Sequence, residues 1–298
     1  MIHYNSCPVC GSAEINLKLN CYDYFKTNES FPIWTCSGCG IGFTQDRPEE
    51  DKLGYYYESD NYISHGNSSG GIINSVYRVV RNFALNNKRE VVKQASGRAV
   101  GSLLDIGGGT GHFAAKMKQA GWRVKSIEIN DEARRFSISH FGLEALSPAE
   151  ISHLPDSEFD CITLWHALEH LSDLDKYIAE IRRLLKPEGV CVIAVPNINS
   201  YDARYYKERW AAYDVPRHLW HFTPSALDFL FENRAFKLLN IKLQPVDVFY
   251  ISILSERYRK NPVPFFAGLF KGLIFAARTL FNKNGGSSLI YVFTKQVF

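Results

Sequence analysis

Glycines and an acidic residue are concentrated at one turn near the middle of this 298-residue sequence. Gly107, Gly109 and Gly111 form a G-x-G-x-G loop that follows a short apolar run containing Asp105. Glycine permits the sharp turn and the close ligand approach that a nucleotide-binding loop needs. The pattern therefore predicts a ligand site at a strand-to-helix turn, and a turn that only packs the sheet is the alternative.

The spacing and charge of this loop indicate the kind of ligand. A dinucleotide loop reads G-x-G-x-x-G and would place its last glycine at position 112, where this chain has His112. Asp105 would repel a pyrophosphate, whereas it would attract the ammonium group of a methionine moiety. The loop therefore favours a cationic ligand without phosphate groups.

Two C-x-x-C pairs near the N-terminus have the spacing of metal ligands. Each pair presents two thiolates from one tight turn, and two such turns supply four sulfurs in tetrahedral geometry. Four thiolates leave no open coordination position, so we expect a structural Zn²⁺. A redox pair or unligated thiols are the alternatives. The predicted ligands are Cys7, Cys10, Cys36 and Cys39.

A third group of reactive side chains lies between residues 213 and 224. A histidine can deprotonate an acceptor near neutral pH, so His218 or His221 is the predicted catalytic residue. The alternative is that Arg217 and His218 form a buried polar network that supports the site. Thr223 is expected to cap the next helix, with Pro224 at its first position.

The elements that must position these groups alternate between strands and helices. This order predicts a mainly parallel sheet that is covered on both faces. Trp165 and His166 follow a strand and should face the ligand cleft, although Trp165 also fits a core position. Strands are expected at 103–106, 124–129, 161–165, 189–195, 236–242 and 287–295, and helices at 75–95, 111–120, 131–141 and 172–185.

The stretch from about 102 to 195 resembles the class I S-adenosylmethionine-dependent methyltransferases. Asp105-Ile106-Gly107-Gly108-Gly109-Thr110-Gly111 resembles their first motif, and Glu128 resembles the acid that holds both ribose hydroxyls. Further resemblance lies in the segments FDCI at 159–162, LEHL at 168–171 and LLKPEG at 184–189. The last of these has Glu188 where the family more often has glycine.

This resemblance implies an α/β fold with a Rossmann-like seven-stranded sheet whose last strand is antiparallel. It also implies S-adenosylmethionine as the cofactor. The residues that would hold it are Asp105, Gly107, Gly109 and Glu128. Ala149 and Glu150 would contact its adenine ring, and Trp165 would also line the cofactor site.

A zinc module ahead of such a core resembles the layout of certain sugar C-methyltransferases. The expected function is transfer of a methyl group to a small-molecule acceptor, a sugar or a related metabolite. One alternative is methylation of a nucleic acid or protein recruited by the zinc module. Another is a non-catalytic protein that only binds S-adenosylmethionine. A net charge of +3 is too mild for a nucleic-acid-binding surface, so no nucleic acid is expected.

The predicted organisation has three parts: a zinc-binding module at 1–46, a connector with a lid and helical segment at 47–95, and the methyltransferase domain at 96–298. Tyr62 and His65 of the connector are candidates to cover the pocket. Absence of a basic, apolar leader and of an apolar run of membrane-spanning length predicts a cytoplasmic protein.

The apolar segment at 262–281 is predicted to be a helical insertion in the last part. Packing on the core or formation of a homodimer is the favoured interpretation of this segment. Peripheral contact with a membrane, toward a lipid-linked acceptor, is the alternative.

Overall fold

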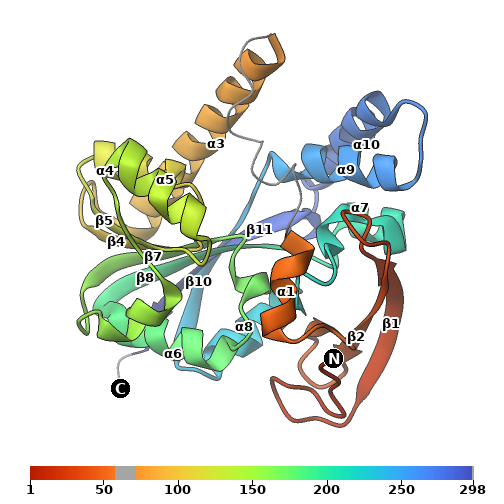
Figure 1. The fold of residues 1–298 in the computed structure, drawn as a ribbon, viewed down its shortest axis with the longest axis horizontal. Coiled ribbons are helices and arrows are strands. Elements are labelled where there is room, and N and C mark those ends of the chain that lie inside the picture. Colours follow the sequence, from red (N-terminus) through yellow and green to blue (C-terminus); the bar gives the residue numbers. More distant parts are fainter. Residues whose placement is uncertain (58–71, 297–298) are drawn as a thin grey trace.

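The computed structural model describes residues 1–57 and 72–296, with side chains described up to residue 57 and from residue 81 onward. Among these residues, seven strands form one sheet in the order β10-β11-β8-β7-β4-β5-β6 (Figure 1). β11 runs antiparallel to both neighbours, whereas the pairs from β8 to β6 are parallel. The α/β sheet with an antiparallel last strand is confirmed. Its strands are β4 (Ser102–Ile106), β5 (Arg123–Ile127), β6 (Glu144–Leu146), β7 (Phe159–Trp165), β8 (Leu185–Pro196), β10 (Phe236–Leu243) and β11 (Ser288–Lys295).

Helices cover both faces of this sheet. Successive residues of β4 are fully buried on opposite sides: Leu103 packs with α3 and α4, and Leu104 packs with α6 and α8. Such continuous burial is expected for strands of a parallel sheet. The helices of this layer are α3 (Ile72–Ser96), α4 (His112–Gln119), α5 (Asp131–Phe141), α6 (Leu174–Leu184) and α8 (Pro224–Glu232).

Side-chain caps fix where several helices begin. Asn130, Asp173 and Thr223 each accept a hydrogen bond from the backbone three residues ahead, at the starts of α5, α6 and α8. Each cap satisfies an amide that the first helical turn leaves unpaired. The predicted cap at Thr223, with Pro224 in the first helical position, is confirmed.

Strand β8 begins four residues before the predicted start at Gly189. Leu185 pairs with Phe159 and Val190 pairs with Cys161, so the residues between them form a bulge. Burial of the Leu185 side chain directly after α6 starts the strand early. The segment 185–189 is therefore an irregular part of the strand and not a separate turn.

The N-terminal residues form a second sheet that a later part of the chain, the strand β9, completes. β1 (Ile15–Tyr22), β2 (Ser30–Cys36) and β3 (Gly42–Thr44) are antiparallel, and β9 (Trp220–His221) pairs with β3. Cys7, Cys36 and Cys39 belong to the same apolar cluster as the main sheet. A strand of two residues gives no periodic signal, so this junction is not visible in the sequence.

Smaller elements surround the carboxyl ends of the parallel strands. A helical hairpin, α9 with α10, lies apart from the sheet at the upper right of Figure 1. No helix among the described residues is long and apolar enough to cross a membrane. The predicted lid residues Tyr62 and His65 lie outside the described residues. The remaining helices are α1 (Glu50–Tyr57), α7 (Tyr201–Tyr206), α9 (Asp247–Tyr258) and α10 (Pro264–Arg278), with short 3-10 turns at η1 (Pro148–His153), η2 (Leu168–His170), η3 (Lys207–Arg209), η4 (Ala211–Tyr213) and η5 (Lys283–Gly285).

Candidate active site

The glycine loop between β4 and α4 has the backbone conformation that its sequence predicts. Gly107 has φ +75°, and a Cβ there would lie 2.5 Å from the Cβ of Ala167. Gly109 also has positive φ, yet an added Cβ would meet nothing within 4 Å. The loop therefore packs against the segment that follows β7 at Gly107, and it is open at Gly109. Gly107 thus brings residues 166–170 next to the predicted cofactor loop.

Glu128 lies at the carboxyl end of β5 beside this loop. Its carboxylate accepts hydrogen bonds from the backbone amides of Gly109, at 2.7 Å, and Asn130, at 2.9 Å. These bonds fix its orientation and leave lone pairs on both oxygens. A half-buried carboxylate held in this way can accept two adjacent hydroxyl groups.

Asp105 is buried at the end of β4, and its nearest cation comes from α3. The Thr163 hydroxyl donates to its carboxylate at 2.7 Å. Burial raises the pKa of Asp105 to about 6, while Thr163 and the charge of Lys88 act in the opposite direction. Burial lowers the pKa of Lys88, and the charges of Asp105 and Asp247 partly counteract this decrease. The sequence assigns Asp105 to a cationic ligand, and the structure already has the charge of Lys88 acting on this carboxylate.

Trp165 ends β7 and is buried among apolar side chains. Its ring meets Phe113 edge-on at 5.4 Å between centroids, and the Lys88 ammonium lies 4.8 Å from the ring centroid. The core position considered for Trp165 is therefore the one found. Lys88 also interacts electrostatically with Asp105 at the end of β4 and with Asp247 at the start of α9.

The two candidates for the adenine ring lie in the turn η1 after β6. Ala149 is exposed, and the carboxylate of Glu150 accepts hydrogen bonds from the Ser147 amide and hydroxyl at 2.7 and 2.8 Å. Glu150 therefore caps its own turn. The carbonyl of Ala149 accepts a hydrogen bond from the Ser152 hydroxyl at 3.4 Å, so the backbone of this turn is also held locally.

His166 is the first residue after β7 and is held between two carboxylates. Its Nε2 lies 2.8 Å from Asp247 at the start of α9, and its Nδ1 lies 3.3 Å from Glu169. Burial lowers the pKa of His166, but the two acids outweigh this and raise it to about 10. The ring is therefore an imidazolium at neutral pH, with φ +55° in a conformation that non-glycine residues adopt rarely.

Glu169, His170 and His218 come together on the far side of this ion pair. One polar atom from each lies within 4.8 Å of the others. Glu169 is fully buried, and its carboxylate lies 3.3 Å from Nδ1 of His166. A metal ion here would face the positive charge of His166, so the cluster suits proton transfer better than metal binding.

His218 has one free ring nitrogen in this cluster. Its Nδ1 lies 2.9 Å from the carbonyl of Ala212, which requires the hydrogen on Nδ1 and leaves a lone pair on Nε2. Burial, with the charge of His170, lowers the pKa of His218 to about 4. The ring is neutral at pH 7 and its Nε2 can accept a proton.

His221 and Arg217 bind the N-terminal module to the same segment. The Thr44 hydroxyl donates to the backbone carbonyl of His218, so it accepts from Nε2 of His221 at 3.0 Å. The Arg217 guanidinium pairs with Asp23 of the module at 2.9 Å and with Asp214 at 2.6 Å. Arg217 therefore belongs to the buried polar network considered from the sequence, and His221 joins it through the module.

The four predicted metal ligands converge at one point of the N-terminal module. Cys7 and Cys39 lie 3.6 Å apart and Cys10 and Cys36 lie 3.5 Å apart between sulfurs, with all four within 4.8 Å. A tetrahedron with Zn–S bonds of ~2.3 Å has an edge of about 3.8 Å, so the sulfurs fit Zn²⁺. Each pair ends in a turn closed by a glycine amide bond back to the first cysteine of the pair.

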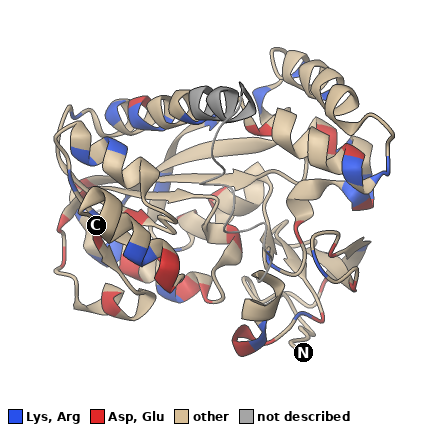
Figure 2. Cartoon of the chain, turned by 45° about the horizontal axis from the view of Figure 1, so that its top comes forward, with Lys and Arg blue, Asp and Glu red and all other residues tan. Residues whose placement is uncertain are grey.

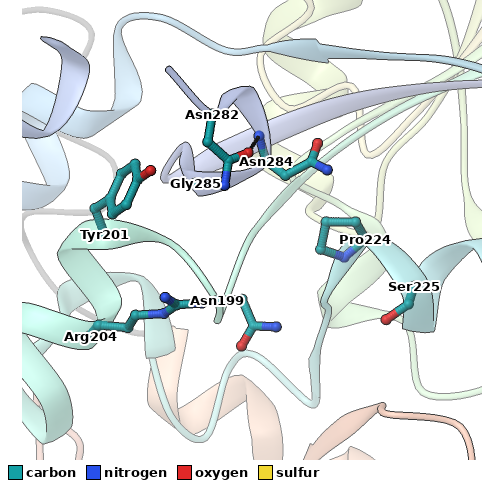
Figure 3. Close-up of a pocket in the computed structure, with 8 residues that line it drawn as sticks. All are labelled: Asn199, Tyr201, Arg204, Pro224, Ser225, Asn282, Asn284 and Gly285. Atoms are coloured by element: carbon teal, nitrogen blue, oxygen red, sulfur yellow. Dashed lines mark hydrogen bonds between the residues drawn. The ribbon is translucent and has the colours of Figure 1, made fainter. Parts of the chain in front are cut away.

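A hollow of about 250 Å³ lies elsewhere, between α7, α8 and the loop before β11 (Figure 3). The side chains of Arg204 and Asn199 border it on one side and Asn284 on another (Figure 3). None of the residues predicted for cofactor, metal or catalysis lines it. It is lined by Asn199, Tyr201, Arg204, Pro224, Ser225, Asn282, Asn284 and Gly285.

Comparison with known proteins defines the class that this sheet and glycine loop belong to. Residues 80–241 match the family model described as a methyltransferase domain, so the chain belongs to the methyltransferase-domain family. The solved complex between the Haloferax volcanii Trm112 methyltransferase activator and a proposed methyltransferase has the same fold. The match has a TM-score of 0.51 at 17% identity and covers 77% of this chain and 100% of that one.

Two curated relatives show particular proteins to which the chain is similar. A ubiquinone/menaquinone biosynthesis C-methyltransferase of Marinomonas is 31% identical over 113 residues, 34% of this chain and 45% of the relative. A malonyl-[acyl-carrier protein] O-methyltransferase of Serratia marcescens is 30% identical over 126 residues, 41% and 48% respectively. The chain spans about half the length of the curated relatives it matches.

Sequence reasoning missed several groups that the fold brings to the site. Lys88 comes from a helix ahead of the sheet, and Asp247 comes from the segment between its last two strands. The pair Glu169 and His170 was noted only as part of a motif. Asp247 is the charged residue of the otherwise apolar run PVDVFYI at 245–251, and that contrast could have drawn attention to it. Lys88 lies in the polar run NNKRE at 86–90 and gives no such signal.

Proposed function

We propose that this protein transfers a methyl group from S-adenosylmethionine to a small-molecule acceptor. The observation that carries the proposal is the glycine loop at the carboxyl end of β4, flanked by two oriented acids, in a chain of the methyltransferase-domain family. Ligands of open α/β sheets bind at this edge. The proposal requires a methionine ammonium group and a ribose at the two acids.

The roles of the cofactor residues follow from charge. Asp105 would attract the methionine ammonium group, and Lys88 beside it would pair with the methionine carboxylate. Glu128, held by two backbone amides, would accept the ribose hydroxyls. Gly109 leaves room for the ligand at the loop's open side.

The acceptor would lie against the loop after β7, which touches the glycine loop at Ala167. The methyl group of a sulfonium is already activated, so the protein mainly has to align the acceptor and exclude water. Where the acceptor must lose a proton, Nε2 of His218 is the proposed base, because it is neutral and unbonded. Glu169 would stabilise the imidazolium that forms, as a carboxylate does beside a catalytic histidine. His221, bonded to Thr44, is assigned a supporting role.

The proposed acceptor class is a sugar or a related metabolite, supported by the position of a thiolate module ahead of the methyltransferase core. Zn²⁺ at the four cysteines would hold that module in shape. This matters for the site because Asp23 of the module pairs with Arg217, the residue next to the proposed base. The metal would supply structure and no reaction step.

Calorimetric titration with S-adenosylmethionine tests the cofactor assignment. We expect Asp105→Ala and Glu128→Ala to weaken binding by about 10- to 100-fold, since charge-assisted hydrogen bonds are worth ~1.5–3 kcal/mol each. Glu132→Ala, which removes an exposed acid from the neighbouring helix, is the control and should bind like the wild type. Unchanged binding in both site variants would remove the assignment.

A screen with a labelled methyl donor tests the acceptor. The panel contains free and nucleotide-linked sugars, quinone precursors, acyl-carrier substrates, an RNA and a protein extract. Label in a sugar product supports the proposed class. Label only in a macromolecule would replace it, and tight cofactor binding without transfer to any acceptor would favour a binding protein.

A further inference from the structure

The hairpin of α9 and α10 presents large apolar side chains to solvent along one face. Phe266 is 71% exposed, Phe270 63% and Leu273 61%, and these residues recur at the i, i+4, i+7 spacing of one helix face. Other large apolar residues extend this face at both ends. They are Val263, Phe265, Leu269, Ile274, Leu280 and Phe281.

The opposite face of α10 is already occupied. Gly268, Gly272 and Phe275 are its buried residues, again at i, i+4, i+7. A Cβ at Gly268 would lie 2.4 Å from the Cα of Ile253, so α9 packs directly against the glycines. The sequence therefore puts its two glycines and Phe275 inward, and Phe266 and Phe270 outward. The core packing expected for 262–281 accounts only for the glycine face.

The charges around this face have one sign. Between residues 248 and 286 the acid is Glu256, which is 2% exposed and paired with Arg259. Figure 2 shows no acidic residue on α10. Lys271 and Arg278 lean away from the phenylalanines and stack on Tyr205 and Tyr201 of α7. The half-buried or exposed cations of this stretch are Arg257, Arg259, Lys260, Lys271, Arg278 and Lys283.

We propose that the outer face of α10 docks the protein on an anionic lipid bilayer. An interfacial helix combines a face of Phe and Leu with flanking Lys and Arg, and it lies in the membrane plane without spanning it. At 15 residues α10 would cover about 22 Å of that plane. A second copy of the chain fits less well, because a twofold contact through this face would bring its cations against their equivalents.

The docking face is connected to the candidate active site. α9 begins at Asp247, whose carboxylate lies 2.8 Å from His166. A bilayer that fixes the hairpin would therefore hold the acceptor side of the site near its surface. The docking itself depends only on the hairpin and does not require that the proposed function be correct.

Co-sedimentation with vesicles tests the docking. The full-length protein is mixed with phosphatidylglycerol-containing vesicles and with pure phosphatidylcholine vesicles. We expect partition into the anionic vesicles to fall at least ~tenfold in the double variant Phe266→Glu/Phe270→Glu, because each exposed phenylalanine would lose its apolar contact. Lys271→Gln/Arg278→Gln should lower it roughly fivefold for each cation removed.

The matched control is Phe83→Glu/Leu239→Glu, which makes the same change at exposed apolar residues of α3 and β10. It should bind vesicles like the wild type, and all variants are required to keep the wild-type melting temperature. Equal binding by the hairpin and control variants, or no binding by the wild type, would overturn the proposal. So would a wild-type dimer that dissociates in Phe266→Glu/Phe270→Glu without any vesicle binding, since the face would then be a subunit contact.

Discussion

The cofactor edge and the acceptor side of this molecule are built in different ways. Asp105, Gly107, Gly109 and Glu128 come from one strand-turn-helix-strand unit. Backbone bonds within it hold Glu128 against the glycine loop, and the neighbouring strand β7 adds the Thr163 bond to Asp105. The acceptor side brings together His166, the chain around His218, the start of α9 and the N-terminal module. One region depends on local geometry, and the other depends on the whole fold.

This difference determines what each region needs to stay intact. A local unit keeps its shape as long as its strand and helix form. A site assembled from distant segments loses its geometry when any one of them moves, because small displacements disturb reacting groups. We therefore expect disturbance far from the chemistry to affect the acceptor side first.

Loss of the thiolate cluster should have the largest effect. Cys36→Ser/Cys39→Ser removes half of the proposed zinc ligands, and structural zinc contributes ~10–16 kcal/mol to the folding of small metal-bound modules. We expect the N-terminal module to unfold and methyl transfer to stop. Zinc content, near-ultraviolet circular dichroism and turnover measure this.

Cys191→Ala provides the control, because that thiol is buried in β8 as a small apolar group away from the cluster. Its variant should keep its zinc and most of its activity. A double variant that retains full turnover would mean that the acceptor side does not depend on the module.

Replacement of the proposed base separates the two regions directly. For His218→Gln we expect kcat to fall about 10²- to 10⁴-fold, the usual contribution of a general base. The dissociation constant for S-adenosylmethionine should not change, since the residue lies on the acceptor side. His153→Gln, an exposed histidine of η1, should leave both quantities at their wild-type values. Loss of cofactor binding in His218→Gln would contradict the division into two regions.

The cofactor edge can be predicted from the sequence more completely than the acceptor side. The alternation of strands and helices, the cap at Thr223, the glycine loop and the position of Glu128 can all be predicted, because each rests on local spacing or on a continuous motif. Trp165 remained ambiguous, because a strand end looks the same whether the side chain lines a cleft or packs inside.

The acceptor side could be predicted only in part. His218 was identified by its type, whereas its approach to Glu169 and His170 depends on how two separate segments meet. The pairing of β3 with β9 joins residues more than 170 positions apart through two residues of strand. No local pattern records such contacts.

The pH dependence of cofactor binding tests the role of Asp105 at the cofactor edge. Asp105 has a raised pKa of about 6, so its charge, and its attraction for an ammonium group, are lost as the pH falls through 6. We expect the dissociation constant for S-adenosylmethionine to rise by about tenfold for each pH unit below that value. Lys88→Met removes a charge that lowers this pKa, so the loss should begin at a higher pH. An identical pH profile in Lys88→Met would contradict an electrostatic interaction between these residues.

The smallest expected effect is a loss of stability at alkaline pH, which arises from His166 on the acceptor side. The pKa of His166 is raised from an ordinary value of 6.5 to about 10 by Asp247 and Glu169. A histidine with a raised pKa stabilises the folded state fully below its unfolded pKa, and this contribution is lost as the pH rises through the folded pKa. The melting temperature should therefore fall between pH 7 and pH 10, by about 2–4 °C for each kcal/mol lost. His166→Gln should melt lower at pH 6 and show a weaker dependence on pH, whereas His153→Gln should follow the wild type. If the melting temperature of His166→Gln fell with alkaline pH as much as that of the wild type, the ion pair between His166 and Asp247 would not be the source of this pH dependence.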